Sequence, residues 1–143
     1  MHLAAAIRAA EPRDAALLAS LIGQLGYEVT ESEVAERLVA MQSEGGPVLV
    51  AELDGQVVAC LSTSIMRVLH RPAPVGRISM MVVDEALRGR GIGAALVRAA
   101  EEALAAQGCH IGEVTSHVRR TEAHRFYERL GYEKTSVRLA KTL

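Results

Sequence analysis

The sequence lacks tryptophan, and its aromatic residues are Phe126, Tyr27, Tyr127 and Tyr132 alone. Because single-stranded nucleic acids stack their bases on aromatic side chains, this scarcity argues against a base-stacking platform. The chain also lacks an excess of either charge, since 16 Lys and Arg face 17 Asp and Glu for a formal net charge of −1. The balance excludes a strong, sequence-independent attraction to nucleic-acid phosphates or anionic lipid.

Cysteines and long apolar runs are scarce as well. Cys60 and Cys109 are too few for a disulfide framework and have no metal-ligand spacing, so we expect two reduced core thiols and no metal. No apolar run is long enough to cross a bilayer, and residues 1–8 do not resemble a signal peptide. These features predict a cytoplasmic protein that binds neither nucleic acid nor membrane.

The residues that are present favour one folded domain spanning residues 1–143. Half of the residues are hydrophobic, and the mean hydropathy is +0.16, which excludes disorder as a description of the chain. A chain of this length buries roughly 68% of the surface that its unfolded form exposes. It shows no internal repeat and no low-complexity linker.

Local signals predict four helices. Thr30 and Glu33 form a capping box at the start of the second helix, and Gly45 follows its end. Thr121 is expected to cap the last, short helix, and Gly131 follows that helix. The helices are expected over residues 12–25, 30–44, 91–107 and 121–130.

Six strands are expected, and two of them form a hairpin. Val48–Leu53 and Gln56–Leu61 flank Asp54 and Gly55, a pair typical of a type I′ turn. The other strands are expected over residues 3–9, 78–83, 111–116 and 135–139. The element order is therefore β-α-α-β-β-β-α-β-α-β, which predicts an α/β fold with a mixed central sheet and helices on both faces.

A glycine-rich turn between a buried strand and a long helix is the most informative segment. It reads Arg88-Gly89-Arg90-Gly91-Ile92-Gly93-Ala94. Glycine lets a ligand approach the backbone closely, and the free N–H groups at a helix start attract anions such as pyrophosphate. Arg88 and Arg90 add positive charge at its rim.

Two further interpretations of this turn remain. A tight turn could use glycine only for its positive φ, although three alternating glycines and two arginines exceed that need. A dinucleotide site fits the loose pattern Gly89-x-Gly91-x-x-Ala94, with Glu113 about 20 residues on. Five residues separate strand and first glycine, however, and the strands of a doubly wound half are missing. A Walker A loop is excluded, because no Lys-Ser/Thr pair follows.

Arg88-x-x-Gly91-x-Gly93 resembles the pyrophosphate loop of the GNAT N-acetyltransferase superfamily. The segment Ala123-His124-Arg125-Phe126-Tyr127, followed by Leu130-Gly131-Tyr132, is similar to that family's C-terminal motif. The predicted element order also matches its fold over essentially the whole chain. The resemblance implies a GNAT-like fold, acetyl-CoA as acetyl donor and a primary amine of a small molecule or peptide as acceptor.

The resemblance also implies site residues. The strand before the loop is expected to bind pantetheine through main-chain groups, with Met81 and Val83 the best candidates. Tyr127 matches the family's tyrosine acid, and a phenol with an ordinary pKa near 10 stays protonated at pH 7. From the residues alone, Tyr127 is instead an aromatic side chain on a buried helix face. The expected donor-binding residues are Met81, Val82, Val83, Arg88, Gly89, Arg90, Gly91, Ile92, Gly93, Ala94 and Arg120.

The chain departs from the family pattern at two positions. Arg120 stands where the family often has Asn, and Ser79 stands where a catalytic Glu is common. The base that takes the proton from the amine is therefore not assigned, and its candidates are His70, His117, His124 and bulk water. The resemblance implies an acceptor site between the first two helices and the strand ends near Leu69 and Ser116. Its expected lining residues are Tyr27, Met66, His70, Ser79 and His117.

Two other function classes stay open: a catalytically silent CoA-binding module and a nucleotide-binding domain. The C-terminal residues 135–143 are also expected to form a homodimer contact, because sheet edges invite pairing.

Overall fold

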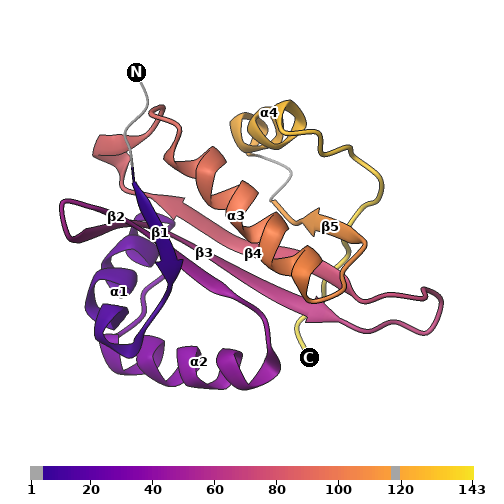
Figure 1. Cartoon of the computed structure of the whole chain (residues 1–143), viewed down its shortest axis with the longest axis horizontal. Coiled ribbons are helices and arrows are strands. Elements are labelled where there is room, and N and C mark those ends of the chain that lie inside the picture. The colour runs from indigo at the N-terminus through magenta and orange to yellow at the C-terminus, as the bar shows by residue number, and fades with distance from the viewer. Residues whose placement is uncertain (1–4, 117–119) are drawn as a thin grey trace.

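The structure, a computed structural model, describes residues 5–116 and 120–143 and contains one mixed sheet flanked by helices (Figure 1). The strands are β1 (Ala6–Ala9), β2 (Val48–Leu53), β3 (Gln56–Met66), β4 (Val75–Val83) and β5 (Ile111–Val114). The α-helices are α1 (Ala15–Gln24), α2 (Glu31–Glu44), α3 (Ile92–Ala106) and α4 (Thr121–Arg129). Two short 3-10 helices, η1 (Pro12–Asp14) and η2 (Glu85–Leu87), precede α1 and α3.

The sheet confirms the predicted α/β class. Its strand order is β1-β2-β3-β4-β5, with antiparallel pairs from β1 to β4 and a parallel pair between β4 and β5. Because β4 and β5 run parallel, the chain has to cross over between them, and it does so through α3. The predicted hairpin joins β2 to β3, and Asp54 and Gly55 have φ angles of 52° and 78°.

Helices cover both faces of the sheet, as expected. In Figure 1, α1 and α2 lie below the sheet, and α3 and α4 lie above it. Successive side chains of β2 alternate between these layers: Leu49 and Ala51 join the core under α3, and Val50 joins the core of α1 and α2. Each large side chain buried in this way contributes about 1.5–3 kcal/mol.

The start of α2 confirms the predicted capping box. The Glu33 N–H donates to the Thr30 hydroxyl at 3.1 Å, and the Thr30 N–H donates to the Glu33 carboxylate at 2.9 Å. Two N–H groups that the helix cannot satisfy itself are thereby paired. Gly45 ends the helix with a φ of 85°, the left-handed conformation that glycine adopts without strain.

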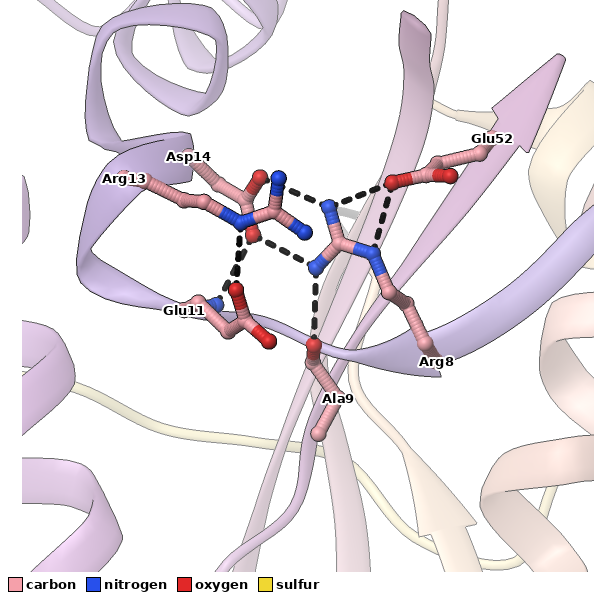
Figure 2. Close-up of polar contacts among 6 residues, drawn as sticks. All are labelled: Arg8, Ala9, Glu11, Arg13, Asp14 and Glu52. Carbon is pink, nitrogen blue, oxygen red and sulfur yellow. Dashed lines mark hydrogen bonds and ion pairs between the residues drawn. The ribbon is translucent and has the colours of Figure 1, made fainter. Parts of the chain in front are cut away.

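A polar cluster ties β1 to β2 and to the start of α1 (Figure 2). Arg8 donates to both oxygens of Asp14 at 2.8 Å, and its Nε donates to Glu52 at 2.7 Å. The buried Asp14 carboxylate also accepts the Glu11 N–H at 2.8 Å. The hydrogen bond from Arg8 holds the pKa of Asp14 below its ordinary value. The cluster therefore fixes where α1 begins relative to the sheet, and it leaves the buried carboxylate fully paired.

Three sequence expectations differ from the structure. The strand expected over residues 135–139 is wrong: residues 132–143 contain no helix or strand, and the exposed side chains of Val137 and Leu139 pack against no core. Its alternating pattern is compatible with a strand, but no neighbouring edge pairs with it. Thr121 is the first helical residue of α4, and Arg120 occupies the cap position. The strand expected over residues 111–116 ends at Val114.

Within residues 5–116 and 120–143, no helix has the length and apolar character that crossing a membrane requires.

Candidate active site

The site begins where β4 continues past the end of β5. The two strands pair only from Val75 with Ile111 to Ile78 with Val114. The second half of β4, residues 79–83, has a partner on the β3 side but none on the β5 side among the described residues. Among the described residues this edge of β4 is free of a strand partner on the β5 side, here called the gap, and an extended ligand can hydrogen-bond to such an edge.

The backbone of β4 presents Met81 and Val83 to that gap. The Asp84 N–H donates to the Val58 carbonyl at 2.8 Å. This hydrogen bond shows which residues of β4 direct their backbone groups toward β3 and which direct them away. Because hydrogen-bonding direction alternates along a strand, Met81 and Val83 point their N–H and C=O groups away from β3. The Arg88 guanidinium confirms this direction, since its Nε donates to the Val83 carbonyl at 3.2 Å.

Val82 differs from its two neighbours. Its backbone groups face β3, and its side chain lies buried in the core of α1 and α2. Val82 therefore presents no backbone hydrogen-bonding group to the gap on the β5 side of β4, and its expected contact with the donor rests on the family resemblance.

The glycine turn stands at one end of the free edge. Gly89 and Gly91 have φ angles of 77° and 85°, so each adopts a conformation that disfavours other residues. Gly91 caps α3 without a side-chain hydrogen bond. The first N–H group that bonds within α3 is that of Ala95, which donates to the Gly91 carbonyl at 3.1 Å. The helix therefore provides no carbonyl partner for the earlier N–H groups of Ile92, Gly93 and Ala94.

Gly93 has a different role, inside the first turn of α3. A Cβ at this position would lie 3.4 Å from the Met81 side chain and 3.4 Å from the Phe126 ring. The missing side chain lets the start of α3 lie close to both β4 and α4. The turn, the free edge and α4 are thereby held next to one another, which is what a shared binding site requires.

Tyr127 enters this site from α4. Its side chain is 8% exposed and makes edge-to-face contacts with Phe126 and Tyr132, at ring separations of 5.0 and 5.8 Å. The Tyr132 hydroxyl donates to Glu101 on α3 at 2.8 Å, which holds that ring in place. Burial raises the pKa of Tyr127 to about 12, so the phenol keeps its proton at neutral pH.

A small pocket of about 130 Å³ joins these features. Ser79 contributes a hydroxyl that lies 2.8 Å from the buried hydroxyl of Ser62 on the neighbouring strand. The pocket is lined by Leu25, Tyr27, Ile78, Ser79, Met80, Met81, Val114, Thr115, Ser116, Arg120, Ala123 and Tyr127.

The structure brings together some of the residues that the sequence singled out and separates others. Tyr127, Met81, Ser79, Tyr27 and Arg120 share the pocket. Met66 ends β3 and His70 lies exposed in the following loop, and neither lines it. His117 lies outside the described residues.

Thr115 and Ser116 line the pocket; the resemblance placed the acceptor site near the strand end at Ser116, but neither hydroxyl was named as a site residue. They directly follow β5, at the carboxyl end of a strand that pairs in parallel with β4. Ligands commonly bind at such strand ends, and this rule would have pointed to the two hydroxyls.

A second cavity of about 230 Å³ lies apart from this site, between the end of α2 and the end of α3. Its polar side chains are the amides of Gln42 and Gln107, and none of its lining residues is ionisable.

Across residues 5–116 and 120–143, no group of three His, Cys, Asp or Glu side chains is placed to hold a metal ion. The polar side chains of the first pocket among the described residues are the phenols of Tyr27 and Tyr127, the hydroxyls of Ser79, Thr115 and Ser116, and the Arg120 guanidinium.

The family model described as "Acetyltransferase (GNAT) family" matches residues 15–132. An aminoalkylphosphonate N-acetyltransferase from Salmonella typhimurium is 36% identical over 90 residues, covering 63% of this chain and 58% of that protein. A second curated relative is matched over 39% of its length, so the chain spans roughly half the length of the curated relatives it matches.

Solved structures match over nearly the whole chain. Glucosamine-6-phosphate N-acetyltransferase from Arabidopsis thaliana has a TM-score of 0.84 at 27% identity, covering 98% of this chain and 99% of that one. An acetyltransferase from Trypanosoma brucei has a TM-score of 0.84 at 26% identity, covering 98% of this chain and 100% of that one.

Proposed function

This chain belongs to the acetyltransferase (GNAT) family, and from that premise we propose that it moves an acetyl group from acetyl-CoA to a primary amine of a small molecule or peptide. The observation that carries the proposal is the meeting of three features. An anion-binding helix start, a free strand edge and a protonated phenol converge where β4 separates from β5. The second cavity, lined by Gln42 and Gln107, combines none of them.

The residues fit the donor in two parts. The N–H groups at the start of α3, beside Arg88 and Arg90, suit the pyrophosphate, because the helix dipole adds roughly half a positive charge there. The N–H and C=O groups of Met81 and Val83 suit the amides of the pantetheine arm, as a partner strand would. Acetyl-CoA supplies the activated thioester.

The pocket residues then assist acyl transfer. The neutral amine nitrogen forms a bond to the acetyl carbon, the carbon–sulfur bond breaks, and the sulfur leaves as a thiolate. Tyr127 is the group suited to give that sulfur its proton, because its phenol is protonated and lines the pocket. The amine then loses its proton, and the group that accepts it stays open among His70, His117, His124 and bulk water, as the sequence left it.

The relatives' names support an amine of a small molecule as acceptor. Both the curated relative and the Arabidopsis enzyme are named as N-acetyltransferases of small molecules. A catalytically silent CoA-binding module remains the alternative, because Ser79 stands where the family often has a Glu base. Both functions include binding of acetyl-CoA, but only the acetyltransferase transfers the acetyl group to an amine.

One pair of measurements tests the proposal. Calorimetry is expected to show binding of acetyl-CoA and none of NAD, and a thiol-release assay over a panel of primary amines is expected to show turnover. If the protein binds acetyl-CoA but no amine on the panel causes thiol release, the protein is a catalytically silent CoA-binding module. Binding of NAD in place of acetyl-CoA would contradict both functions.

We also propose a homodimer formed through the C-terminal segment. Val137, Leu139 and Leu143 are exposed, and β5 has no partner on its outer edge within the described part of the chain. Pairing of this segment with the β5 edge of a second copy would cover both surfaces. Sedimentation is expected to give about twice the 15.3 kDa chain mass, and truncation after Glu133 is expected to give a monomer. A monomer at every micromolar concentration of the full chain would contradict this proposal.

A further inference from the structure

The pocket beside Tyr127 carries a single type of charge. Among the twelve described residues that line it, Arg120 alone is charged, and neither aspartate nor glutamate is among them. Within residues 5–116 and 120–143, Arg120 forms no ion pair and donates no hydrogen bond. A positive group is thus available to a ligand at this site without breaking an existing contact.

The other arginines beside the site are placed differently. Arg88 donates to the Val83 carbonyl. Arg77, on the paired half of β4, contacts Glu113 on β5 at 2.7 Å. Neither lines the pocket. Among the residues that the structure describes, Arg120 is therefore the cation that lines the acceptor pocket.

We propose that the acceptor is a primary amine that also carries an oxyanion, and that Arg120 recognises this oxyanion together with the hydroxyls of Thr115 and Ser116. The inference rests on the proposed function, because it names the substrate class for the same pocket. A guanidinium offers a planar fork of N–H donors that matches the oxygens of a phosphonate, phosphate or carboxylate. Hydroxyl groups can donate to the remaining oxygen atoms.

The shape of the pocket limits the acceptor further. Leu25 and Tyr27 line the pocket together with Met81 and Tyr127, the two residues that the proposed function assigns to the donor and to the transfer step. Because the space is only about 130 Å³, we expect an acceptor in which the amino group and the oxyanion lie within a few bonds of each other. A diamine of the same length would bring a second positive charge toward Arg120, and we expect the pocket to discriminate against it.

The competing assignment places Arg120 on the phosphates of the donor, as the family resemblance implied. The two assignments differ in which ligand loses affinity when Arg120 is changed. Arg120→Gln keeps a polar, shorter side chain and removes the charge. Arg125→Gln is the matched control, because Arg125 is exposed on the same helix and does not line the pocket.

The experiment compares four short acceptors of similar size: 2-aminoethylphosphonate, β-alanine, propylamine and 1,3-diaminopropane. In the wild type, kcat/KM is expected to be highest for one of the two oxyanion acceptors and lowest for the diamine. Arg120→Gln is expected to raise KM for the preferred oxyanion acceptor about 10- to 100-fold, the loss typical of a hydrogen bond between charged groups. The constants for propylamine and the dissociation constant of acetyl-CoA are expected to stay unchanged, and Arg125→Gln is expected to match wild type.

Comparable kcat/KM values for all four acceptors in the wild type would overturn the inference. So would an Arg120→Gln variant that loses affinity for acetyl-CoA and keeps its KM for the oxyanion acceptor. Calorimetry of 2-aminoethylphosphonate and β-alanine with CoA-loaded protein separates this inference from the proposed function. Binding that Arg120→Gln weakens, without thiol release, would support the oxyanion site and contradict catalysis.

Discussion

Replacement of Tyr127 by Phe is expected to lower kcat by about 10²- to 10⁴-fold, the usual contribution of general acid catalysis. The substitution removes only the hydroxyl, so the ring keeps its edge-to-face contacts with Phe126 and Tyr132. The dissociation constant of acetyl-CoA and the melting temperature are expected to stay close to those of the wild type. Steady-state kinetics with a thiol-release assay measures the effect.

The pH dependence gives a second readout for Tyr127. Because burial raises its pKa to about 12, the phenol is protonated and competent as an acid up to strongly alkaline pH. The acceptor amine, by contrast, becomes reactive as it loses its proton. Activity is therefore expected to rise with pH through the alkaline range, with no decline from Tyr127 ionisation until the pH approaches 12.

Tyr132→Phe is the matched control for this prediction. It also removes one aromatic hydroxyl, but that hydroxyl bonds Glu101 and does not line the pocket. We expect at most a small loss of stability and little change in kcat. Full activity in Tyr127→Phe, or a change confined to KM, would remove Tyr127 from the role of acid and leave it as a packing residue.

Gly91→Glu is expected to weaken acetyl-CoA binding by about 100-fold or more, because juxtaposed like charges cost several kcal/mol. The new carboxylate would stand at the cap of α3, among the N–H groups assigned to the pyrophosphate. The side chain would also strain a backbone whose φ is 85°. Calorimetric titration with acetyl-CoA measures the change.

Two further variants separate charge from strain. Gly91→Ala carries the same backbone strain without the carboxylate, so its donor affinity is expected to lie between those of the wild type and Gly91→Glu. Gly108→Glu places a carboxylate at another positive φ, 92°, in open space past the far end of α3. It is expected to bind acetyl-CoA as the wild type does. Unchanged affinity in Gly91→Glu would show that the glycine turn does not hold the donor.

Features set by neighbouring residues were predictable from the sequence. The capping box of Thr30 and Glu33 and the Asp54-Gly55 hairpin depend on backbone geometry within a few positions, and both are confirmed. The glycine turn was recognisable for the same reason. Gly89 and Gly91 adopt positive φ angles at the start of a long helix, where the pattern placed them.

Features that depend on distant partners were less accessible. The alternating residues 135–139 are compatible with a strand, yet a strand exists only where a neighbouring edge pairs with it. Val82 resembles its neighbours in sequence, and only the register of β3 with β4 turns its backbone groups away from the gap. The grouping of Thr115, Ser116 and Arg120 beside Tyr127 likewise requires the three-dimensional meeting of β5 and α4.

The most direct test of the central claim is an amide NMR titration of the protein with CoA, which maps where the donor lies. The largest shift changes are expected at Met81, Val83 and residues 91–94, the backbone groups that face the gap between β4 and β5. Gln42 and Gln107, which line the other cavity, are expected to stay unperturbed. Shift changes concentrated around that second cavity, with the β4 edge and the glycine turn unmoved, would contradict the donor site described above.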